Sequence, residues 1–280
     1  KQFKQVDAIR IHQAAGAIPA LLVHWLYRKP LIVRAGFQWY SFSKHQGASH
    51  LKLAVISLIE RLAYRSAASV IQTTRHDADF VASRYGVEQS KIHVIPNWIA
   101  TERFKPMDVK KEPRTVCYVG RLEPEKNLEA LVAAMEGTEA RLILYGEGSK
   151  QLALDNLARR LHVQVEFRGR IANEDLPSAL NACEIFALPS LYEGNPKVLL
   201  EAMACGLPCV GTNVKGIAAV IQDGETGLLC DPAANALRET LKRLLGDHEL
   251  QNRLGEQARR QILPTASLDQ AIQREVILYS

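Results

Sequence analysis

A regular alternation of two kinds of segment begins near residue 115. Short apolar runs rich in β-branched residues alternate with segments whose apolar residues recur at helical spacing. Strands and helices that alternate in this way form βαβ units, whose parallel sheet is covered by helices on both faces. Strands are predicted at residues 115–119, 141–145, 163–167, 185–188 and 208–211. We therefore predict a doubly wound α/β domain, followed by helices over 235–245, 249–262 and 267–278, with Pro264 interrupting the last two.

The first part of the chain follows the same rule with fewer strands. Strands are predicted at residues 7–11, 31–34, 69–72 and 91–95. A complete doubly wound domain has about six strands, so this part is expected to lack its first ones. Between them, the segment from Leu51 to Leu62 is apolar around nearly its whole circumference, which favours a buried helix over a membrane-touching one.

The length of 280 residues favours two domains. The polar, proline-flanked segment 97–112 is the predicted linker. We expect one domain over residues 1–108 and a second over 109–265, with a C-terminal helix over 266–280 packed against the first.

The charge of the chain is unevenly divided. Residues 1–110 hold 16 Lys and Arg against 7 Asp and Glu, a balance of +9, and residues 111–280 hold 19 against 23, a balance of −4. A basic half attracts anionic membranes, phosphorylated substrates or nucleic acid, although scattered surface lysines produce the same balance. The basic residues form no runs and are not interleaved with aromatic residues, so nucleic acid is not a predicted partner. An anionic membrane surface is a predicted partner.

The loops that follow the strands are the candidate binding sites, because ligands of open α/β sheets bind at the carboxyl ends of the strands. Gly120, Arg121 and Lys126 precede a helix, and a glycine, two cations and a helix amino terminus suit a phosphate. Gly146 and Gly148 form a GxG turn, a weak signal because tight turns need glycine anyway. The third glycine of a dinucleotide fingerprint and the GxxxxGK[ST] pattern are missing, so neither a dehydrogenase nor a P-loop ATPase is supported.

Two glutamates follow the predicted strand at 185–188. Glu193 lies in a turn with Gly194, ahead of Pro196, and Glu201 lies about one and a half turns into the helix that Pro196 favours. Carboxylates from a loop and a helix at one strand end can accept hydrogen bonds from different hydroxyls of one polyhydroxy ligand.

Four stretches together carry a family resemblance. "YVGRLEPEKN", "YGEGS", "EGNPKVLLEAMACGLP" and "VKGIAAVIQDGETGLLCDP" occur in this order. They resemble the donor half of retaining glycosyltransferases of the GT-B fold, glycosyltransferase family 4, and the likeness extends over residues 66–262. It implies two Rossmann-like doubly wound domains facing a cleft. It also implies transfer of a hexose from a UDP-, GDP- or ADP-sugar to a glycan or lipid-linked acceptor, with retention and without metal, in polysaccharide or glycolipid biosynthesis.

The resemblance implies roles for individual residues. Arg121 and Lys126 would hold the donor diphosphate and stabilise the leaving nucleotide. Glu201 would bind the ribose hydroxyls, and Glu193 would face the sugar. His12 matches a histidine at the end of a family strand and is counted with Glu193, Arg121 and Lys126 as catalytic. The other donor-binding residues implied are Gly120, Gly146, Gly148, Arg170, Ile171, Gly194, Asn195, Pro196, Lys197, Val198 and Leu199.

The chain departs from the family pattern in three places. Many members read E-G-F-G where this chain has Asn195 and Pro196 after Glu193 and Gly194, so the sugar pocket is expected to differ. Ala35 stands where a functional histidine is common. The family's first strand and glycine-rich loop, which help bind the acceptor, are absent from the sequence, so a fragment is expected.

Alternatives to a transferase remain open: a GT-B-type epimerase or phosphorylase, or a non-catalytic nucleotide-sugar-binding fragment. The DxD pattern of Asp77 and Asp79 is a metal signature of a different glycosyltransferase fold, but its place at a predicted helix start favours an interaction with the helix dipole. The eight histidines are scattered, so no metal or cofactor is predicted. The five cysteines form no CxxC pair, and buried free thiols are predicted. The predicted location is the cytoplasm, at the inner face of the cell membrane.

Overall fold

The computed structural model describes residues 5–278, except for the side chain of residue 15, and the chain forms two compact units. Unit 1 contains the residues up to Asn97 and those from Ala271 onward, and unit 2 is Trp98–Gln270. Most of the predicted linker belongs to unit 2, because Ile99 and Phe104 are buried in that unit's core.

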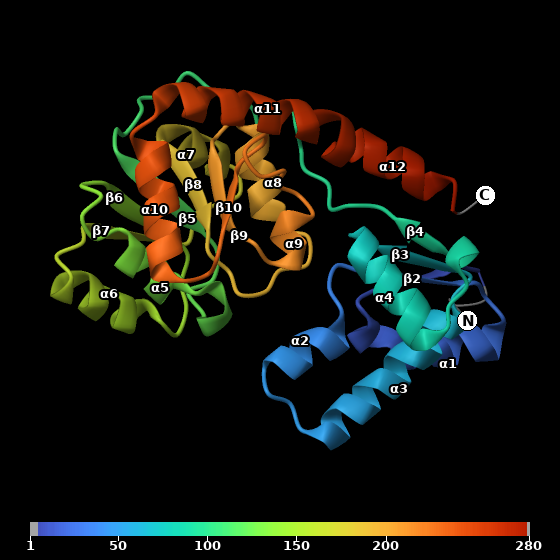
Figure 1. Ribbon diagram of the computed structural model, residues 1–280. Coiled ribbons are helices and arrows are strands. Elements are labelled where there is room, and N and C mark those ends of the chain that lie inside the picture. The colour runs from blue at the N-terminus through green and yellow to red at the C-terminus, as the bar shows by residue number, and fades with distance from the viewer. Residues whose placement is uncertain (1–4, 279–280) are drawn as a thin grey trace. The chain divides into compact units, whose positions relative to one another are not determined.

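Unit 1 is built on four parallel strands in the order β1-β2-β3-β4 (Figure 1). The strands are β1 (Ile9–His12), β2 (Leu31–Ala35), β3 (Ser69–Gln72) and β4 (Ile92–Val94). The helices between them are η2 (Ala14–Gly16), α1 (Ala17–Tyr27), α2 (Trp39–His45), α3 (His50–Ser66), α4 (Arg75–Tyr85) and η3 (Gln89–Lys91). The four predicted strands are confirmed, with ends that differ by up to two residues.

Both faces of this sheet are covered, as successive residues of β2 demonstrate. Leu31 and Val33 pack with residues of α1, α3 and α4. Ile32 points to the opposite face and packs with Ala271 of α12 (Leu268–Val276). Glu275 of the same helix forms ion pairs with Arg10, at 2.7 Å, and with Arg34.

The start of α4 explains the DxD pattern. The Thr74 hydroxyl accepts a hydrogen bond from the Asp77 amide at 3.1 Å and donates one to the Asp77 carboxylate at 2.8 Å. Thr74 is thus the N-cap and Asp77 lies in the first turn, so the predicted place of the pattern at a helix start is confirmed. Within residues 5–278, no three His, Cys, Asp or Glu side chains are grouped so that they could hold a metal ion.

The prediction that the segment from Leu51 to Leu62 forms a buried helix is wrong. The buried side chains of α3 are Ile56, Glu60, Ala63 and Tyr64. On the outward side Leu51 is 77% exposed and Leu58 is 58% exposed. The reason is that a helix in the outer layer of a sheet buries one face only. No described helix combines the length and the apolar character needed to cross a bilayer.

Unit 2 is a six-stranded parallel sheet in the order β10-β9-β8-β5-β6-β7. Its strands are β5 (Thr115–Val119), β6 (Arg141–Tyr145), β7 (Val165–Gly169), β8 (Ile185–Leu188), β9 (Cys209–Thr212) and β10 (Leu228–Cys230). Its helices are η4 (Pro124–Lys126), α5 (Leu128–Ala134), α6 (Gln151–Arg160), α7 (Leu176–Ala182), α8 (Lys197–Ala204), α9 (Lys215–Ala218), α10 (Ala234–Leu245) and α11 (His248–Ala266). The five predicted strands are confirmed, whereas β10 was not predicted.

Helices of unit 2 pack in pairs: α10 lies on α5, and α11 lies on α8 (Figure 1). All five cysteines are buried and free, as predicted. Pro264 does not interrupt the helices where expected, because α11 continues through it to Ala266. The hydroxyl of Thr265 donates to the Gln261 carbonyl at 2.7 Å, and the buried Ile262 and Ala266 hold this last turn against the core.

Candidate active site

The strand order of unit 2 creates one topological switch point, between β5 and β8. From β5 the chain proceeds outward through β6 and β7, and it then returns to β8 on the other side of β5. Open α/β sheets bind ligands in the crevice outside the carboxyl ends of two such strands. The loops that leave β5 and β8 are therefore the ones that a ligand would meet.

Backbone and side-chain hydrogen bonds join these two loops. The Leu191 amide donates to the Glu125 carbonyl at 2.9 Å. Asn127 Nδ2 donates to the carbonyl of Pro189 at 3.1 Å and to that of Pro232 at 2.9 Å. The loops after β5 and β8 therefore form one connected surface.

Glycines allow the loop after β6 to nest against the loop after β5. A Cβ atom on Gly146, whose φ is +138°, would lie 1.9 Å from the Gly120 carbonyl oxygen. A Cβ atom on Gly148 would lie 2.3 Å from the Leu122 carbonyl oxygen. The GxG turn, a weak signal in the sequence, is thus required for backbone to approach backbone.

Lys126 and Glu193, each predicted from a different motif, are in direct contact. Lys126 Nζ lies 2.7 Å from Glu193 Oε1, and their side chains are only 17% and 13% exposed. Ser190 Oγ donates to the same carboxylate oxygen at 2.7 Å. A largely desolvated pair of this kind is poor evidence for stability, because the cost of desolvation offsets the attraction. The Lys126–Glu193 pair is better explained as a way of holding charged side chains in position.

Two predicted arginines are exposed at the rim. The guanidinium of Arg121 pairs with Glu125 at 2.6 Å, and its side chain is 64% exposed. Arg170 follows β7, pairs with Glu147 at 3.0 Å and is 83% exposed. The neighbouring Ile171 packs against the core. Neither Arg121 nor Arg170 is therefore part of a buried network of charges.

The loop after β8 enters α8 through Asn195, which is buried, and Pro196, which is the N-cap. The side chains of Val198 and Leu199 pack against the core, so only their backbone could face a ligand. The Leu199 amide donates to the Pro196 carbonyl at 3.1 Å. An anion at this helix end would therefore depend on the amides that precede it.

Glu201 is a buried carboxylate on α8. Burial raises its pKa to about 7, and the positive charges of Lys197 and Arg103 only partly oppose this shift. Lys197 Nζ lies 4.0 Å from Glu201 Oε1 and 5.0 Å from the centre of the Trp98 ring. A buried acceptor of this kind is costly unless a ligand or another donor satisfies it.

His12 is the one predicted site residue in unit 1. It is exposed at the end of β1. Partial desolvation, together with the positive charges of Arg10 and Arg34, lowers its pKa despite the opposing charge of Glu275. The neutral imidazole is therefore favoured near neutral pH. The functional roles assigned to His12 and to the residues of unit 2 stay predictions.

Three further residues shape the site and were not predicted. Ser190 and Asn127 make the hydrogen bonds described above. A Cβ atom on Gly216 of α9 would lie 2.2 Å from the carbonyl oxygens of both Glu193 and Gly194. Asn127 and Gly216 occur inside the quoted motifs "YVGRLEPEKN" and "VKGIAAVIQDGETGLLCDP", which is the signal that could have found them.

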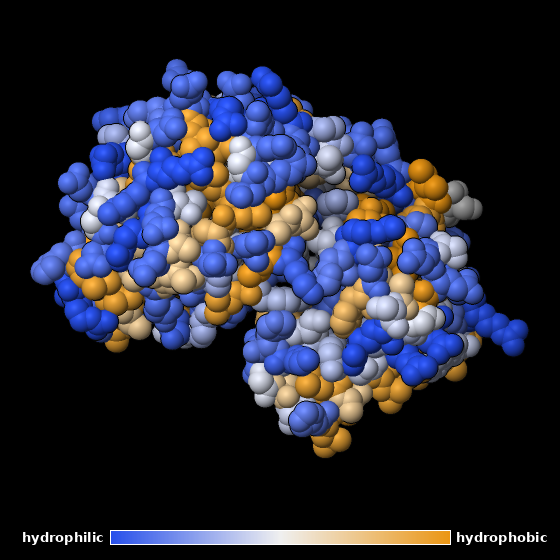
Figure 2. Space-filling model, in the orientation of Figure 1, coloured by the Kyte–Doolittle hydropathy of each residue, from blue (hydrophilic) through white to orange (hydrophobic). Residues whose placement is uncertain are grey.

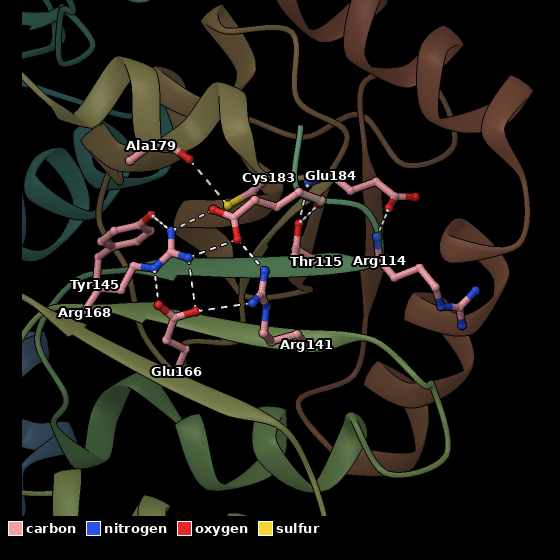
Figure 3. A network of polar contacts seen from close by, with 10 residues as sticks. Arg114, Thr115, Arg141, Tyr145, Glu166, Arg168, Ala179, Cys183 and Glu184 are labelled. Atoms are coloured by element: carbon pink, nitrogen blue, oxygen red, sulfur yellow. Dashed lines mark hydrogen bonds and ion pairs between the residues drawn. The ribbon is translucent and has the colours of Figure 1, made fainter. Parts of the chain in front are cut away.

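A second charged cluster lies along β6 and β7, outside the switch point (Figure 3). Arg168 contacts Glu166 at 2.7 Å, Glu112 at 3.0 Å and the Tyr145 hydroxyl at 2.8 Å. Arg141 also pairs with Glu112. Hydrogen bonds from Arg168 lower the pKa of both Glu112 and Glu166, so these carboxylates stay ionised.

Comparison with known families identifies the chain. Residues 100–261 match the family described as Glycosyl transferases group 1. The chain belongs to this family. Residues 1–103 match a second family description, Glycosyltransferase Family 4. These two matches confirm the predicted family 4 membership. Solved structures that superimpose on the chain confirm the fold of two parallel-sheet α/β domains of GT-B type.

Curated relatives are transferases and synthases. The α-D-kanosaminyltransferase of Streptomyces kanamyceticus is 27% identical over 92% of this chain and 73% of its own length. The mannosylfructose-phosphate synthase of Agrobacterium fabrum is 33% identical over 62% of this chain and 44% of its own length. The chain thus spans between 44% and 73% of the length of these two relatives.

Solved structures resemble the whole chain. HepE from Anabaena, in complex with UDP and glucose, gives a TM-score of 0.86 at 20% identity, over 99% of this chain and 78% of that one. Sucrose-phosphate synthase from Thermosynechococcus elongatus gives 0.83 at 25% identity, over 98% and 73%.

Proposed function

We propose that the protein moves a sugar from a nucleoside diphosphate sugar to a hydroxyl of a glycan or lipid-linked acceptor, with retention at the anomeric carbon and without a metal ion. The observation that carries the proposal is the Lys126–Glu193 pair, 2.7 Å apart, at the switch point between β5 and β8. Solved relatives that hold UDP, and UDP with glucose, support a nucleotide donor.

The proposed binding step exchanges the partners of this ion pair. A diphosphate offers the ammonium of Lys126 more negative charge than one carboxylate does, so it displaces Glu193. Glu193 is then free to accept hydrogen bonds from sugar hydroxyls. Arg121 supplies a second cation from the rim, and Glu201 accepts hydrogen bonds from the ribose diol.

The proposed chemical step breaks the bond between the anomeric carbon and the diphosphate oxygen. The acceptor oxygen forms its bond to that carbon on the same face, and its proton passes to the departing phosphate oxygen. Negative charge grows on the diphosphate in the transition state, so Lys126 and Arg121 stabilise that state more than the bound donor.

Thermal unfolding with UDP, GDP and ADP tests the donor site. We expect one of them to raise the melting temperature, and Lys126→Ala or Glu201→Ala to abolish the shift. Arg159→Ala is the matched control, because Arg159 is an exposed cation paired with Asp155 on α6. A melting curve that no nucleotide changes would contradict nucleotide binding.

Turnover assays separate transfer from the alternatives. Release of nucleoside diphosphate that depends on an added acceptor supports transfer. Conversion of the donor to an isomer without acceptor would replace the proposal with an epimerase, and a requirement for free phosphate would replace it with a phosphorylase.

A further inference from the structure

The outward face of α3 carries an apolar stripe that no described residue of unit 1 covers. Leu51, Val55, Leu58 and Leu62 recur at helical spacing, and all four are exposed. Figure 2 shows hydrophobic residues along the part of unit 1 where Figure 1 places α3. Exposed apolar side chains that gather in one stripe mark an interaction surface, whereas isolated ones do not.

The segment that contains this stripe carries several cations and no exposed carboxylate. From Ala17 to Ser66 the sequence holds seven Lys and Arg and a single acidic residue, Glu60. Glu60 is fully buried, where it accepts hydrogen bonds from the Tyr85 hydroxyl and the Trp39 amide. The surface of this segment therefore presents only positive side-chain charge, from Arg28, Lys29, Lys44, Lys52, Arg61 and Arg65.

A cleft of about 450 Å³ opens beside the stripe, between α2, α3 and α4. Arg61, Arg84 and His50 line it, and Leu58 of the stripe forms part of its wall. Arg84 lies over the Tyr40 ring, 3.7 Å from its centre, and reaches the Ser57 hydroxyl at 3.4 Å. Neither Arg61 nor Arg84 forms an ion pair with a carboxylate among the described residues, although the buried Glu60 lies within the electrostatic reach of Arg84.

We propose that the α3 stripe and this cleft dock the protein on an anionic phospholipid bilayer. Leucine side chains enter the boundary between headgroups and acyl chains, and the flanking cations bind lipid phosphates, with one headgroup in the cleft. A second copy of the chain fits less well, because two such faces would bring like charges together. This inference is independent of the donor and of the reaction.

Vesicle sedimentation of the full chain tests the proposal. We expect binding to vesicles of phosphatidylcholine and phosphatidylglycerol in equal parts, much weaker binding to phosphatidylcholine alone, and loss of the difference at high salt. The variant Arg61→Glu should lower the partition coefficient about thirtyfold, since it reverses one charge near the membrane surface. Leu51→Ser combined with Leu58→Ser should lower it at least tenfold.

Matched controls separate docking from general surface effects. Leu152 on α6 is 73% exposed, close to the 77% of Leu51, so Leu152→Ser should leave binding unchanged. All variants alter exposed residues and should keep the melting temperature of the parent. Equal binding to both kinds of vesicle, or variants that bind like the parent, would overturn the proposal. So would a chain that ignores vesicles and self-associates until the stripe is replaced, because the face would then serve a second copy.

Discussion

Two charged regions of unit 2 use the same residue types for different purposes. In the cluster along β6 and β7, Arg168 directs its nitrogens at Glu112, Glu166 and the Tyr145 hydroxyl, all within 3.0 Å (Figure 3). At the switch point, Lys126 has one side-chain partner among the described residues, Glu193. The N–H groups of Arg168 therefore all have acceptors, whereas Lys126 can donate further hydrogen bonds.

The two regions also differ in the kind of structure that holds them, which is strands for the cluster and loops for the ion pair. Arg168 lies on β7, and two of its three partners, Glu166 and Tyr145, are held on the neighbouring strands β7 and β6. Lys126 lies in a loop that meets a second loop and a glycine turn, at the strand ends where ligands bind. A saturated network stabilises the fold, and an unsaturated pair at a strand end can exchange its partner.

Gly146→Ala tests the close approach between the loop after β6 and the loop after β5. The new Cβ atom would lie 1.9 Å from the Gly120 carbonyl, so we expect a loss of about 3 kcal/mol in the free energy of unfolding, together with loss of nucleotide binding. Denaturant titration measures the first effect and calorimetry the second. Gly224→Ala is the control, because Gly224 has a φ of +75° with no atom within 4 Å, and it should cost about 1 kcal/mol. Equal costs for the two variants would contradict the close approach.

Lys126→Ala and Arg168→Ala separate binding from stability. Lys126→Ala should weaken nucleoside diphosphate binding about a hundredfold, because a charged hydrogen-bonding partner is lost. Arg168→Ala should leave that affinity unchanged and lower the free energy of unfolding by about 2 kcal/mol, since Glu112 and Glu166 lose their shared cation. Titration calorimetry and denaturant melts report the two quantities. The comparison fails if Arg168→Ala weakens binding as much as Lys126→Ala does.

The pH dependence of donor binding sharpens the role of Glu201. Its pKa is raised to about 7, so the carboxylate that accepts ribose hydroxyls is lost as pH falls through 7. Affinity for a nucleotide sugar should therefore fall by up to about tenfold per pH unit below 7, and Glu201→Gln should flatten the profile. A nucleotide sugar is the right ligand, because its diphosphate does not titrate in this range. A parent profile that is already flat would remove Glu201 from the ribose site.

Arg121→Ala should have the smallest effect. The side chain is 64% exposed and already paired with Glu125, so its contribution is screened by solvent. We expect about a fivefold loss of nucleotide affinity, measured by the same calorimetry. Arg159→Ala on α6 should show no loss. A hundredfold loss for Arg121→Ala would mean that this cation, rather than Lys126, holds the diphosphate.

Most of the fold could be predicted from the sequence because apolar runs and segments of helical period alternate in a recognisable pattern. The strands β5 at residues 115–119 and β6 at residues 141–145 were predicted with the ends that the structure has. The three-residue strand β10 is too short to show a period, and α2 lacks an apolar repeat. The outward stripe of α3 was misread because apolarity alone does not tell which face a sheet covers.

The contacts of the site could be predicted only in part. Motifs named Lys126 and Glu193 separately, but the residues are 67 positions apart, and only the placement of β8 beside β5 brings them together. Gly216 approaches the backbone of Glu193 and Gly194 because β9, the strand that precedes it, lies beside β8. Ser190 has no distinguishing pattern of its own, so its hydrogen bond to Glu193 could not be foreseen.

The exchange of partners at Lys126 is tested most directly by titrating Glu193→Gln with a nucleoside diphosphate and with the corresponding nucleotide sugar. We expect the nucleoside diphosphate to bind this variant at least as tightly as it binds the parent, because no carboxylate competes for Lys126. The nucleotide sugar should bind about tenfold more weakly, because its hydroxyls lose a charged acceptor. Equal losses for both ligands, or no change for either, would contradict the account.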